Sequence, residues 1–221
     1  MNEISPFKTE GLGNPEDRAP VACWSCKGPV DAVALFCPTC RAVQPPRPLD
    51  HFARLGLPAA FEVDVAELDR RYFAAQRQLH PDRFATRTAR ERAISQSQAV
   101  ELNAAYETLK DPLARATYLL GLKGIAANPD GCHTVNDPTL LTEQMERREA
   151  LMEADTPAAA AALAEEAASH VRDSEAMISA AFAAGDLEKA GAETTRLKYL
   201  VKLVEEARAR QAKLAAARPA S

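Results

Sequence analysis

Four cysteines near the N-terminus constrain the local fold more tightly than any other feature of this chain. They form two C-x2-C pairs, ten residues apart, in the segment CWSCKGPVDAVALFCPTC: Cys23, Cys26, Cys37 and Cys40. A two-residue gap lets both thiolates of a pair turn toward one tetrahedral ion. The spacer has Gly28-Pro29 to turn it and VALF (33–36) to form a strand. It is therefore long enough for a hairpin that joins the two pairs.

We expect these four thiolates to hold one structural zinc ion, with every coordination position filled by the protein and none open for catalysis. A dithiol redox pair is an alternative, but it is typical of a βαβ pattern that this segment lacks. Disulfides are another, although a reducing cytosol disfavours them. The fifth cysteine, Cys132, has only His133 beside it, and we expect a small buried or loop residue there.

The composition predicts a mainly helical protein. Of 221 residues only 9 are glycine and 5% are aromatic, and alanine, a strong helix former, runs through the second half. The net charge of −4 gives no general case for binding nucleic acid or a membrane surface. The charge is uneven, however: residues 70–92 carry seven arginines against two acids, whereas residues 137–193 are strongly acidic. This asymmetry indicates either two surfaces for two different partners or simply two solvated helix faces.

Helix signals begin after the proline-rich QPPRP at 44–48. A short helix is expected at 50–57, and a second from Asp64, with Glu67 completing a capping box. Its apolar residues follow a helical spacing and predict one buried face: Val65, Leu68, Tyr72, Ala75 and Leu79. Pro81 ends it. Further helices are expected at about 88–110 and 113–122.

The second half predicts a bundle of three long helices. Asp137-Pro138 and Thr156-Pro157 each read as an N-cap followed by proline at the first helical position. Gly185-Asp186 ends one helix and caps the next. The predicted divisions are a flexible N-terminus (1–20), a four-cysteine module (21–43), a linker (44–49), a helical domain (50–123), a second linker (124–136) and a C-terminal bundle (137–217).

No apolar run approaches the ~18 residues that a membrane span needs. The first twenty residues hold four acids against Lys8 and Arg18, unlike a secretory signal or a transit peptide. We therefore expect a cytoplasmic, bacterial protein, with the mitochondrial matrix as the less favoured alternative.

The stretch QLHPDRF (78–84) places a histidine, a proline and an aspartate where the second helix ends. The triplet reads either as an ordinary turn or as a rigid tip that displays His80 and Asp82 to a partner. The neighbouring segments favour the second interpretation. Over residues 50–117 they resemble the successive helices of a J-domain: DHFARLGL, RRYFAAQRQLHPDRF and ELNAAYETLKDPLARATY. The resemblance implies that His80, Pro81 and Asp82 trigger ATP hydrolysis in a DnaK-type chaperone. It also implies a basic docking face: Arg70, Arg71, Arg77 and Arg83.

The resemblance extends to the HscB family, the J-proteins of iron–sulfur cluster assembly. HTVNDPTLLTEQMERREAL (133–151) and RLKYLVKL (196–203) are similar to its client-binding bundle, and the cysteine module is similar to a zinc-binding extension found in some members. The family implies an HscA-like chaperone and an IscU-like scaffold protein as partners. Its scaffold-binding patch maps onto Leu141, Met145, Glu146, Glu149 and Tyr199.

Periodicity gives separate support for that patch. Along the last helix, one apolar stripe predicts the core-facing side: Leu197, Leu200, Val201, Val204 and Ala207. Tyr199 points well away from it. In the helix at 139–153, Leu141, Met145 and Met152 form a row distinct from Leu140 and Leu151. Either this row is an exposed interaction patch, or the helix is buried on two sides.

We therefore expect an all-α protein with a J-domain hairpin and a three-helix bundle, preceded by a small β-hairpin zinc module. It is expected to be a co-chaperone and not an enzyme, because no nucleophile–base pair or phosphate-binding loop stands out. The alternatives are a J-protein for another client, a zinc-ribbon nucleic-acid binder that uses the arginines at 70–92, and a dithiol oxidoreductase. No nucleic-acid or membrane partner is expected.

Overall fold

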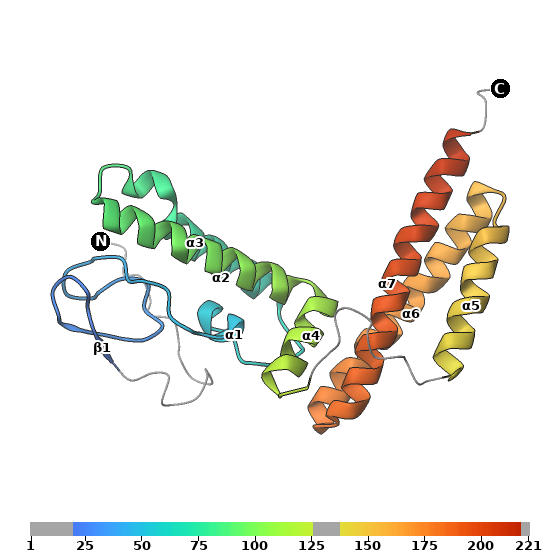
Figure 1. Cartoon of the computed structure of the whole chain (residues 1–221), viewed down its shortest axis with the longest axis horizontal. Coiled ribbons are helices and arrows are strands. Elements are labelled where there is room, and N and C mark those ends of the chain that lie inside the picture. The colour runs from blue at the N-terminus through green and yellow to red at the C-terminus, as the bar shows by residue number, and fades with distance from the viewer. Residues whose placement is uncertain (1–19, 126–137, 218–221) are drawn as a thin grey trace. The chain divides into compact units, whose positions relative to one another are not determined.

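The computed structural model describes residues 20–125 and 138–217. The chain divides into two compact units between Arg115 and Ala116. Figure 1 shows the helices of both and the small strand pair near the start. The expectations for the N-terminal segment, for most of the second linker and for Cys132 and Asp137 concern residues outside the described ranges. In the described part, no helix is both long and apolar enough to cross a membrane.

The first unit opens with two short strands. Strand β1 (Val21–Ala22) pairs antiparallel with β2 (Pro29–Val30). The strand expected at VALF does not form, because Asp31 begins a turn: its carboxylate accepts the N–H of Val33 (3.0 Å) and its carbonyl accepts the N–H of Ala34 (3.0 Å). Of the four VALF residues only Phe36 makes a strand-like bridge, to Val43.

The next helices are α1 (His51–Leu55), α2 (Val65–Leu79), α3 (Ala89–Lys110) and α4 (Pro112–Leu122), with a 3-10 turn, η2 (Pro81–Phe84), between α2 and α3. Helices α1 to α3 lie in the first unit. Helix α1 is shorter than expected, because Asp50 caps its start and Gly56, at φ 68°, ends it. Proline at position 81 stops α2 as expected. Helix α4 begins in this unit and continues past its boundary.

Helices α2 and α3 run antiparallel: the hydroxyl of Tyr106 in late α3 donates to Asp69 in early α2 (2.8 Å), and that of Ser95 in early α3 donates to the carbonyl of Leu79 at the end of α2 (2.6 Å). The predicted face of α2 is buried at four of its five positions: Leu68, Tyr72, Ala75 and Leu79. Each buried leucine contributes about 2 kcal/mol. Val65 is the exception at 44% exposed, since it is the first residue of the helix.

The capping box expected at the start of α2 is only half formed. Asp64 accepts the backbone N–H groups of Ala66 (2.9 Å) and Glu67 (3.2 Å). The Glu67 carboxylate, however, pairs with Arg70 and Arg71 instead of turning back to the cap. The complete box lies at the start of α3, between Thr88 and Glu91. These two residues form the T-x-x-E pattern that is typical of such a box.

The second unit contains the three expected long helices, α5 (Pro138–Glu153), α6 (Pro157–Ala184) and α7 (Leu187–Ala216). Thr156 caps α6, Gly185 ends it at φ 73°, and Asp186 caps α7, as the sequence predicts. Alanines let α6 and α7 pack closely, and six of them are buried: Ala160, Ala164, Ala167, Ala181, Ala190 and Ala207. The all-α class, with a small β-hairpin ahead of the helices, is confirmed.

Candidate functional site

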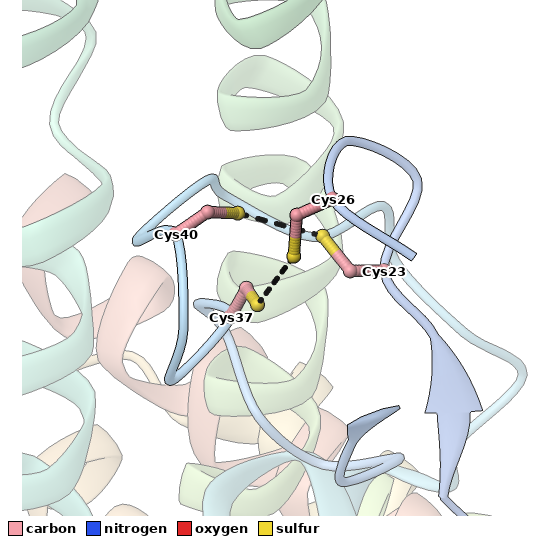
Figure 2. Close-up of side chains that lie close together, drawn as sticks. All are labelled: Cys23, Cys26, Cys37 and Cys40. Atoms are coloured by element: carbon pink, nitrogen blue, oxygen red, sulfur yellow. Dashed lines mark hydrogen bonds between the residues drawn. The ribbon is translucent and has the colours of Figure 1, made fainter. Parts of the chain in front are cut away.

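The four cysteine side chains converge from two loops onto one point (Figure 2). Two sulfur pairs join the two loops: Cys23 Sγ lies 3.7 Å from Cys40 Sγ, and Cys26 Sγ lies 3.7 Å from Cys37 Sγ. All four sulfurs lie within 4.8 Å of one another. Around an ion with metal–sulfur bonds of about 2.3 Å, tetrahedral sulfurs are about 3.8 Å apart. The four thiols are free, and their spacing fits one metal ion.

Both loops have the same backbone geometry, although their sequences share little beyond the cysteines. In each, the residue after the second cysteine has a positive φ (66° at Lys27, 62° at Arg41). The N–H groups of these two residues donate to the carbonyls of Cys23 and Cys37, each at 3.0 Å. L-residues enter this left-handed region only at a cost of about 1 kcal/mol. The same turn geometry therefore occurs in both cysteine loops.

Hydrogen-bond donors prepare Cys23 for the thiolate form. Burial alone would raise the pKa of the Cys23 thiol, but the N–H groups of Cys26 and Ser25 and the Gln44 amide lower it to about 6. The pKa of Cys37 is also lowered, since the N–H of Cys40 outweighs burial. Thiolate is the metal-binding form, so these donors favour coordination at neutral pH.

The pKa of the Cys26 thiol shifts in the opposite direction. The N–H of Gly28 acts to lower the pKa of Cys26, but the sulfurs of Cys40, Cys37 and Cys23, together with burial, raise it to about 11. Thiolates this close repel one another unless a cation lies between them. The chemistry of the four donors thus calls for a positively charged centre.

The second candidate site is the turn of His80, Pro81 and Asp82, which we call the HPD turn. His80 ends α2 and caps η2, and its Nδ1 accepts the backbone N–H of Asp82 (3.3 Å). Pro81 is the first residue of η2, where its missing N–H is not needed. The side chains of His80 and Asp82 are 54% and 89% exposed. The turn therefore displays both groups to solvent.

Buried neighbours hold the HPD turn in place. Phe84, at the end of η2, is buried. The buried hydroxyl of Ser95 in α3 donates to the carbonyl of Leu79, the residue before His80 (2.6 Å). The exposed tip is consequently rigid at its base.

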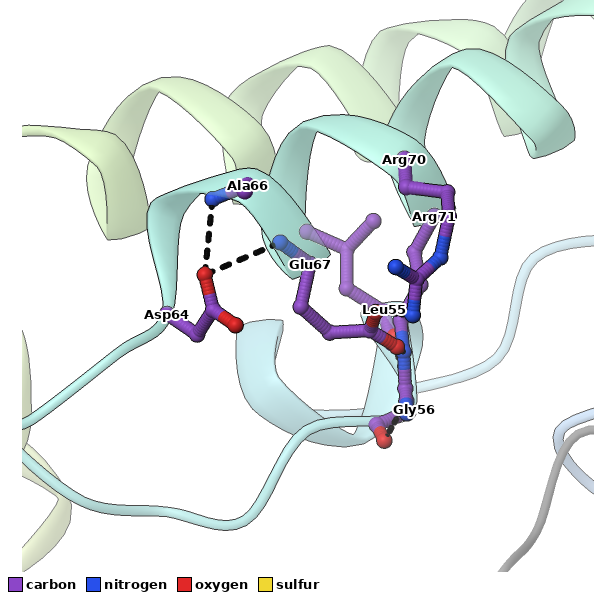
Figure 3. Close-up of polar contacts among 7 residues, drawn as sticks. All are labelled: Leu55, Gly56, Asp64, Ala66, Glu67, Arg70 and Arg71. Carbon is purple, nitrogen blue, oxygen red and sulfur yellow. Dashed lines mark hydrogen bonds and ion pairs between the residues drawn. The ribbon is translucent and has the colours of Figure 1, made fainter.

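The four arginines of the expected docking face fall into two groups. Figure 3 shows Arg70 and Arg71 beside Glu67 at the start of α2. The Arg70 side chain is 73% exposed, and Arg77 and Arg83 are also exposed. Arg71 is only 20% exposed and donates to the backbone carbonyls of Leu55 and Gly56, so it ties α1 to α2.

Sequence reasoning did not assign Phe73 to this face. Phe73 is 47% exposed. It lies three residues after Arg70 and four residues before Arg77, a spacing that puts all three on one side of α2. The sequence did hold a signal for its exposure, because Phe73 directly follows Tyr72 of the buried face of α2 and so lies outside that face. An aromatic side chain between exposed arginines gives the face an apolar contact as well as charge.

The third candidate site is a groove between α5 and α7. Three of the five predicted patch residues line it: Leu141, Met145 and Tyr199. Leu141 is 42% exposed and Met145 is 65% exposed, so the row on α5 faces solvent and the alternative of a helix buried on two sides is wrong for it. The predicted core stripe of α7 is buried except for Val201, which is half-buried.

The other two predicted patch residues lie elsewhere on α5. Glu146 lines a separate hollow with His170, and Glu149, although exposed, lines neither hollow. The groove also has cationic residues that the sequence did not single out: Arg147, Arg148, Arg196 and Lys202. Arg196 reaches across from α7 to Glu143 of α5 (2.8 Å). The helical spacing of Arg148 from Leu141 and Met145 could have revealed its side of α5.

Comparison with known proteins gives consistent matches. A family model described as the HSCB C-terminal oligomerisation domain matches residues 136–208. The iron–sulfur cluster co-chaperone protein HscB of Mus musculus is 36% identical over 187 residues, which is 83% of this chain and 80% of that protein. A co-chaperone protein HscB homolog of Cupriavidus taiwanensis is 41% identical over 157 residues, which is 70% of this chain and 89% of that protein.

A solved structure agrees with these matches. The crystal structure of the human co-chaperone protein HscB aligns with a TM-score of 0.80 and 35% identity, and covers 85% of this chain and 96% of that one. The relatives are named as co-chaperones and not as enzymes. Sequence identity, length coverage and fold agree, and the chain belongs to the HscB family of iron–sulfur cluster co-chaperones.

Proposed function

We propose that this protein stimulates the ATPase of a DnaK-type, HscA-like chaperone and delivers an IscU-like scaffold protein to it. The observation that carries the proposal is the HPD turn, whose histidine and aspartate are exposed on a base anchored by Ser95. A buried or distorted triplet would be an ordinary turn. Exposed and anchored, it suits recognition by another protein.

The chaperone docks, in this proposal, on the exposed face of α2 through Arg70, Arg77 and Arg83. Exposed arginines attract an acidic surface over several ångströms and speed the encounter. Phe73, between Arg70 and Arg77, adds apolar contact area. Arg71 does not join this face, because its guanidinium is engaged with α1.

The scaffold protein binds, in this proposal, in the groove between α5 and α7. Leu141, Met145 and Tyr199 supply its apolar lining, and cationic side chains stand beside them. Exposed apolar side chains that gather at a groove mark an interaction site. In this proposal Glu146 and Glu149 also contact the scaffold protein, although neither lines this groove.

The four cysteines hold zinc, in this proposal, and the ion has a structural role. Sites built from four cysteines at this spacing suit Zn²⁺, and four protein ligands leave no position for a substrate. One tightly held zinc per chain, measured by elemental analysis after purification under reducing conditions, is the expected result. Iron in its place would contradict the choice of metal.

The function is a coupling of two binding events on one chain. Bringing the scaffold and the ATPase together raises the local concentration of each for the other. Hydrolysis then traps the scaffold on the chaperone. No covalent chemistry is assigned to this protein. A bacterial cytoplasmic location stays a prediction, since the relatives come from both bacteria and mammals.

The test is the steady-state ATPase rate of the organism's DnaK-type chaperones with this protein, with and without the scaffold protein. Synergistic stimulation of one chaperone supports the proposal. Stimulation that is the same with and without the scaffold protein supports the J-domain function but contradicts the assignment of the scaffold protein as the client. The variant His80→Gln should abolish stimulation but still bind the scaffold. Full stimulation by this variant would overturn the assignment of the HPD turn.

A further inference from the structure

The buried polar residues of the first unit form a pattern that neither docking nor metal coordination requires. In the described part of that unit the buried polar side chains are Gln44, Ser95, Gln98 and Arg115. Three of them form a single path between the cysteine cluster and the HPD turn. Burying a polar group costs free energy unless the group is hydrogen-bonded. A set of buried hydrogen bonds of this kind therefore favours one packing arrangement of the elements that it joins.

The path begins at a cysteine sulfur. The side-chain amide of Gln44 donates to Cys23 Sγ (3.4 Å) and to the carbonyl of Ala42 (2.8 Å). The backbone carbonyl of Gln44 accepts the side-chain amide of Gln98 in α3 (2.9 Å). Gln44 thus contacts the cluster with its side chain and α3 with its backbone.

The path ends beside the HPD turn. Ser95 lies three residues before Gln98, on the same buried face of α3, and its hydroxyl holds the carbonyl of Leu79 (2.6 Å). Leu79 immediately precedes His80. Two side-chain hydrogen bonds and one turn of helix therefore separate the backbone of Gln44 from the HPD turn.

A second contact joins the module to α3 independently. Trp24 lies between the first two cysteines, and its indole N–H donates to the carbonyl of Val43 (2.7 Å). The guanidinium of Arg90, in the first turn of α3, lies 4.3 Å from the centre of the Trp24 ring. A cation over an indole face is attractive. The cysteine module therefore also contacts the first turn of α3, the end of this helix that follows η2 in the chain.

We propose that Gln44 is a positioning residue that couples metal binding at the four cysteines to the packing of α3 and, through Ser95, to the HPD turn. The coupling rests on metal binding under the proposed function. With a metal bound, the Cys23 thiolate fixes the Gln44 side chain, and the Gln44 carbonyl is held where Gln98 can reach it. Without a metal, the two cysteine loops lose their common anchor and Gln98 loses its acceptor.

Coupling of this kind is reciprocal. If metal binding stabilises the contact between Gln44 and Gln98, then removing that contact must weaken metal binding by the same factor. A residue that served only the core of the helical hairpin would have no effect on metal affinity. Metal affinity is therefore the readout that separates coupling from a purely structural role.

The first experiment is hydrogen exchange on the full chain, loaded with Co²⁺ or stripped with EDTA under reducing conditions. Removal of the metal should speed exchange about tenfold at residues 80–98, the effect of losing one buried hydrogen bond. Residues 138–217 are the internal control and should not change. Faster exchange confined to residues 21–44 would overturn the coupling.

The second experiment measures Co²⁺ affinity from the absorption band of Co²⁺–thiolate coordination. Gln98→Leu should weaken binding about tenfold, the same factor by which the metal stabilises the contact between Gln44 and Gln98, while the shape of the band stays that of four thiolates. The matched control is Gln96→Leu, a glutamine on the same helix that is exposed. Equal affinity in the Gln98 and Gln96 variants would overturn the proposal.

A third variant avoids disturbing the core. Arg90 is exposed, so Arg90→Gln removes only the contact with Trp24 and should weaken Co²⁺ binding about two- to fivefold. Unchanged affinity there would contradict the second contact. If the four cysteines do not bind a metal at all, the wild-type chain will show no thiolate band with Co²⁺. That result would overturn both the metal site and the coupling. A normal band without spread to residues 80–98 overturns the coupling alone.

Discussion

Arg70 and Arg71 are neighbours in the sequence, yet their side chains have different surroundings. Both pair with Glu67, but Arg70 remains mostly in solvent while Arg71 reaches the carbonyls at the end of α1. A single guanidinium that satisfies several acceptors binds two helices together. Under the proposed function Arg71 therefore stabilises the fold and Arg70 docks the chaperone, although both belong to one basic run.

Replacing each arginine by alanine should separate these roles. Arg71→Ala should lower the free energy of unfolding by about 2 kcal/mol, because it leaves the helix-end carbonyls without their charged donor. Arg70→Ala should change it by less than about 0.5 kcal/mol, as exposed ion pairs do, and should weaken chaperone stimulation instead. Urea unfolding and the ATPase assay measure the two effects. A stability loss in Arg70→Ala equal to that in Arg71→Ala would contradict the division.

Among the helices, the cap at the start of α3 makes a contribution to stability that depends on pH. The box of Thr88 and Glu91 starts α3, the helix that carries both Ser95 and Gln98. The hydroxyl and the N–H of Thr88 hold the pKa of Glu91 below its usual 4.5. A lowered carboxyl pKa stabilises the fold above the unfolded pKa, and this contribution is lost as the pH falls through the folded pKa.

Glu91→Gln should remove this part of the pH dependence. Its free energy of unfolding should fall less than that of the wild type between about pH 5 and pH 3, measured by urea titration at each pH. Thr88→Ala should show the same flattening and should also lose about 1 kcal/mol at neutral pH, the effect of a lost N-cap. A difference between Glu91→Gln and the wild type that does not vary with pH would refute the role of the box.

The groove between α5 and α7 depends on how two helices pack, since Leu141 and Tyr199 come from different helices. The double variant Leu141→Ala with Tyr199→Ala should weaken scaffold binding at least about tenfold, because truncated apolar anchors dominate such interfaces. Stimulation without scaffold should be unchanged. The control is Met152→Ala, which is 74% exposed on the same helix but outside the groove. Similar losses in both variants would contradict the position of the site.

Across the full chain, the candidate docking surfaces belong to different compact units. The HPD turn and α2 lie in the first unit, and the groove lies in the second. Under the proposed function each surface binds one partner, and coupling requires that one chain carry both. The proposed coupling therefore requires the intact chain.

A mixing experiment checks this directly. Chains with His80→Gln keep the groove, and chains with Leu141→Ala and Tyr199→Ala keep the HPD turn. An equimolar mixture should show no synergy between scaffold and stimulation, measured by steady-state ATPase rates, because no single chain bridges the two partners. Recovery of wild-type synergy in the mixture would mean that the two surfaces act independently.

Features that depend on near neighbours could be predicted from the amino-acid sequence. The ends of α2 and α6, the buried stripe of α2 and the two cysteine pairs follow from caps, periodicity and spacing, which act within a few residues. The HPD turn and the patch residues came from family resemblance, and the structure gathers three of the five patch residues in one groove. Tertiary packing, in contrast, brings Arg71 to α1, turns the VALF segment at Asp31 and places Gln44 against Gln98. The Gln44–Gln98 contact joins residues 54 apart in the chain, and such a partner is set by how entire elements pack, which no local pattern encodes.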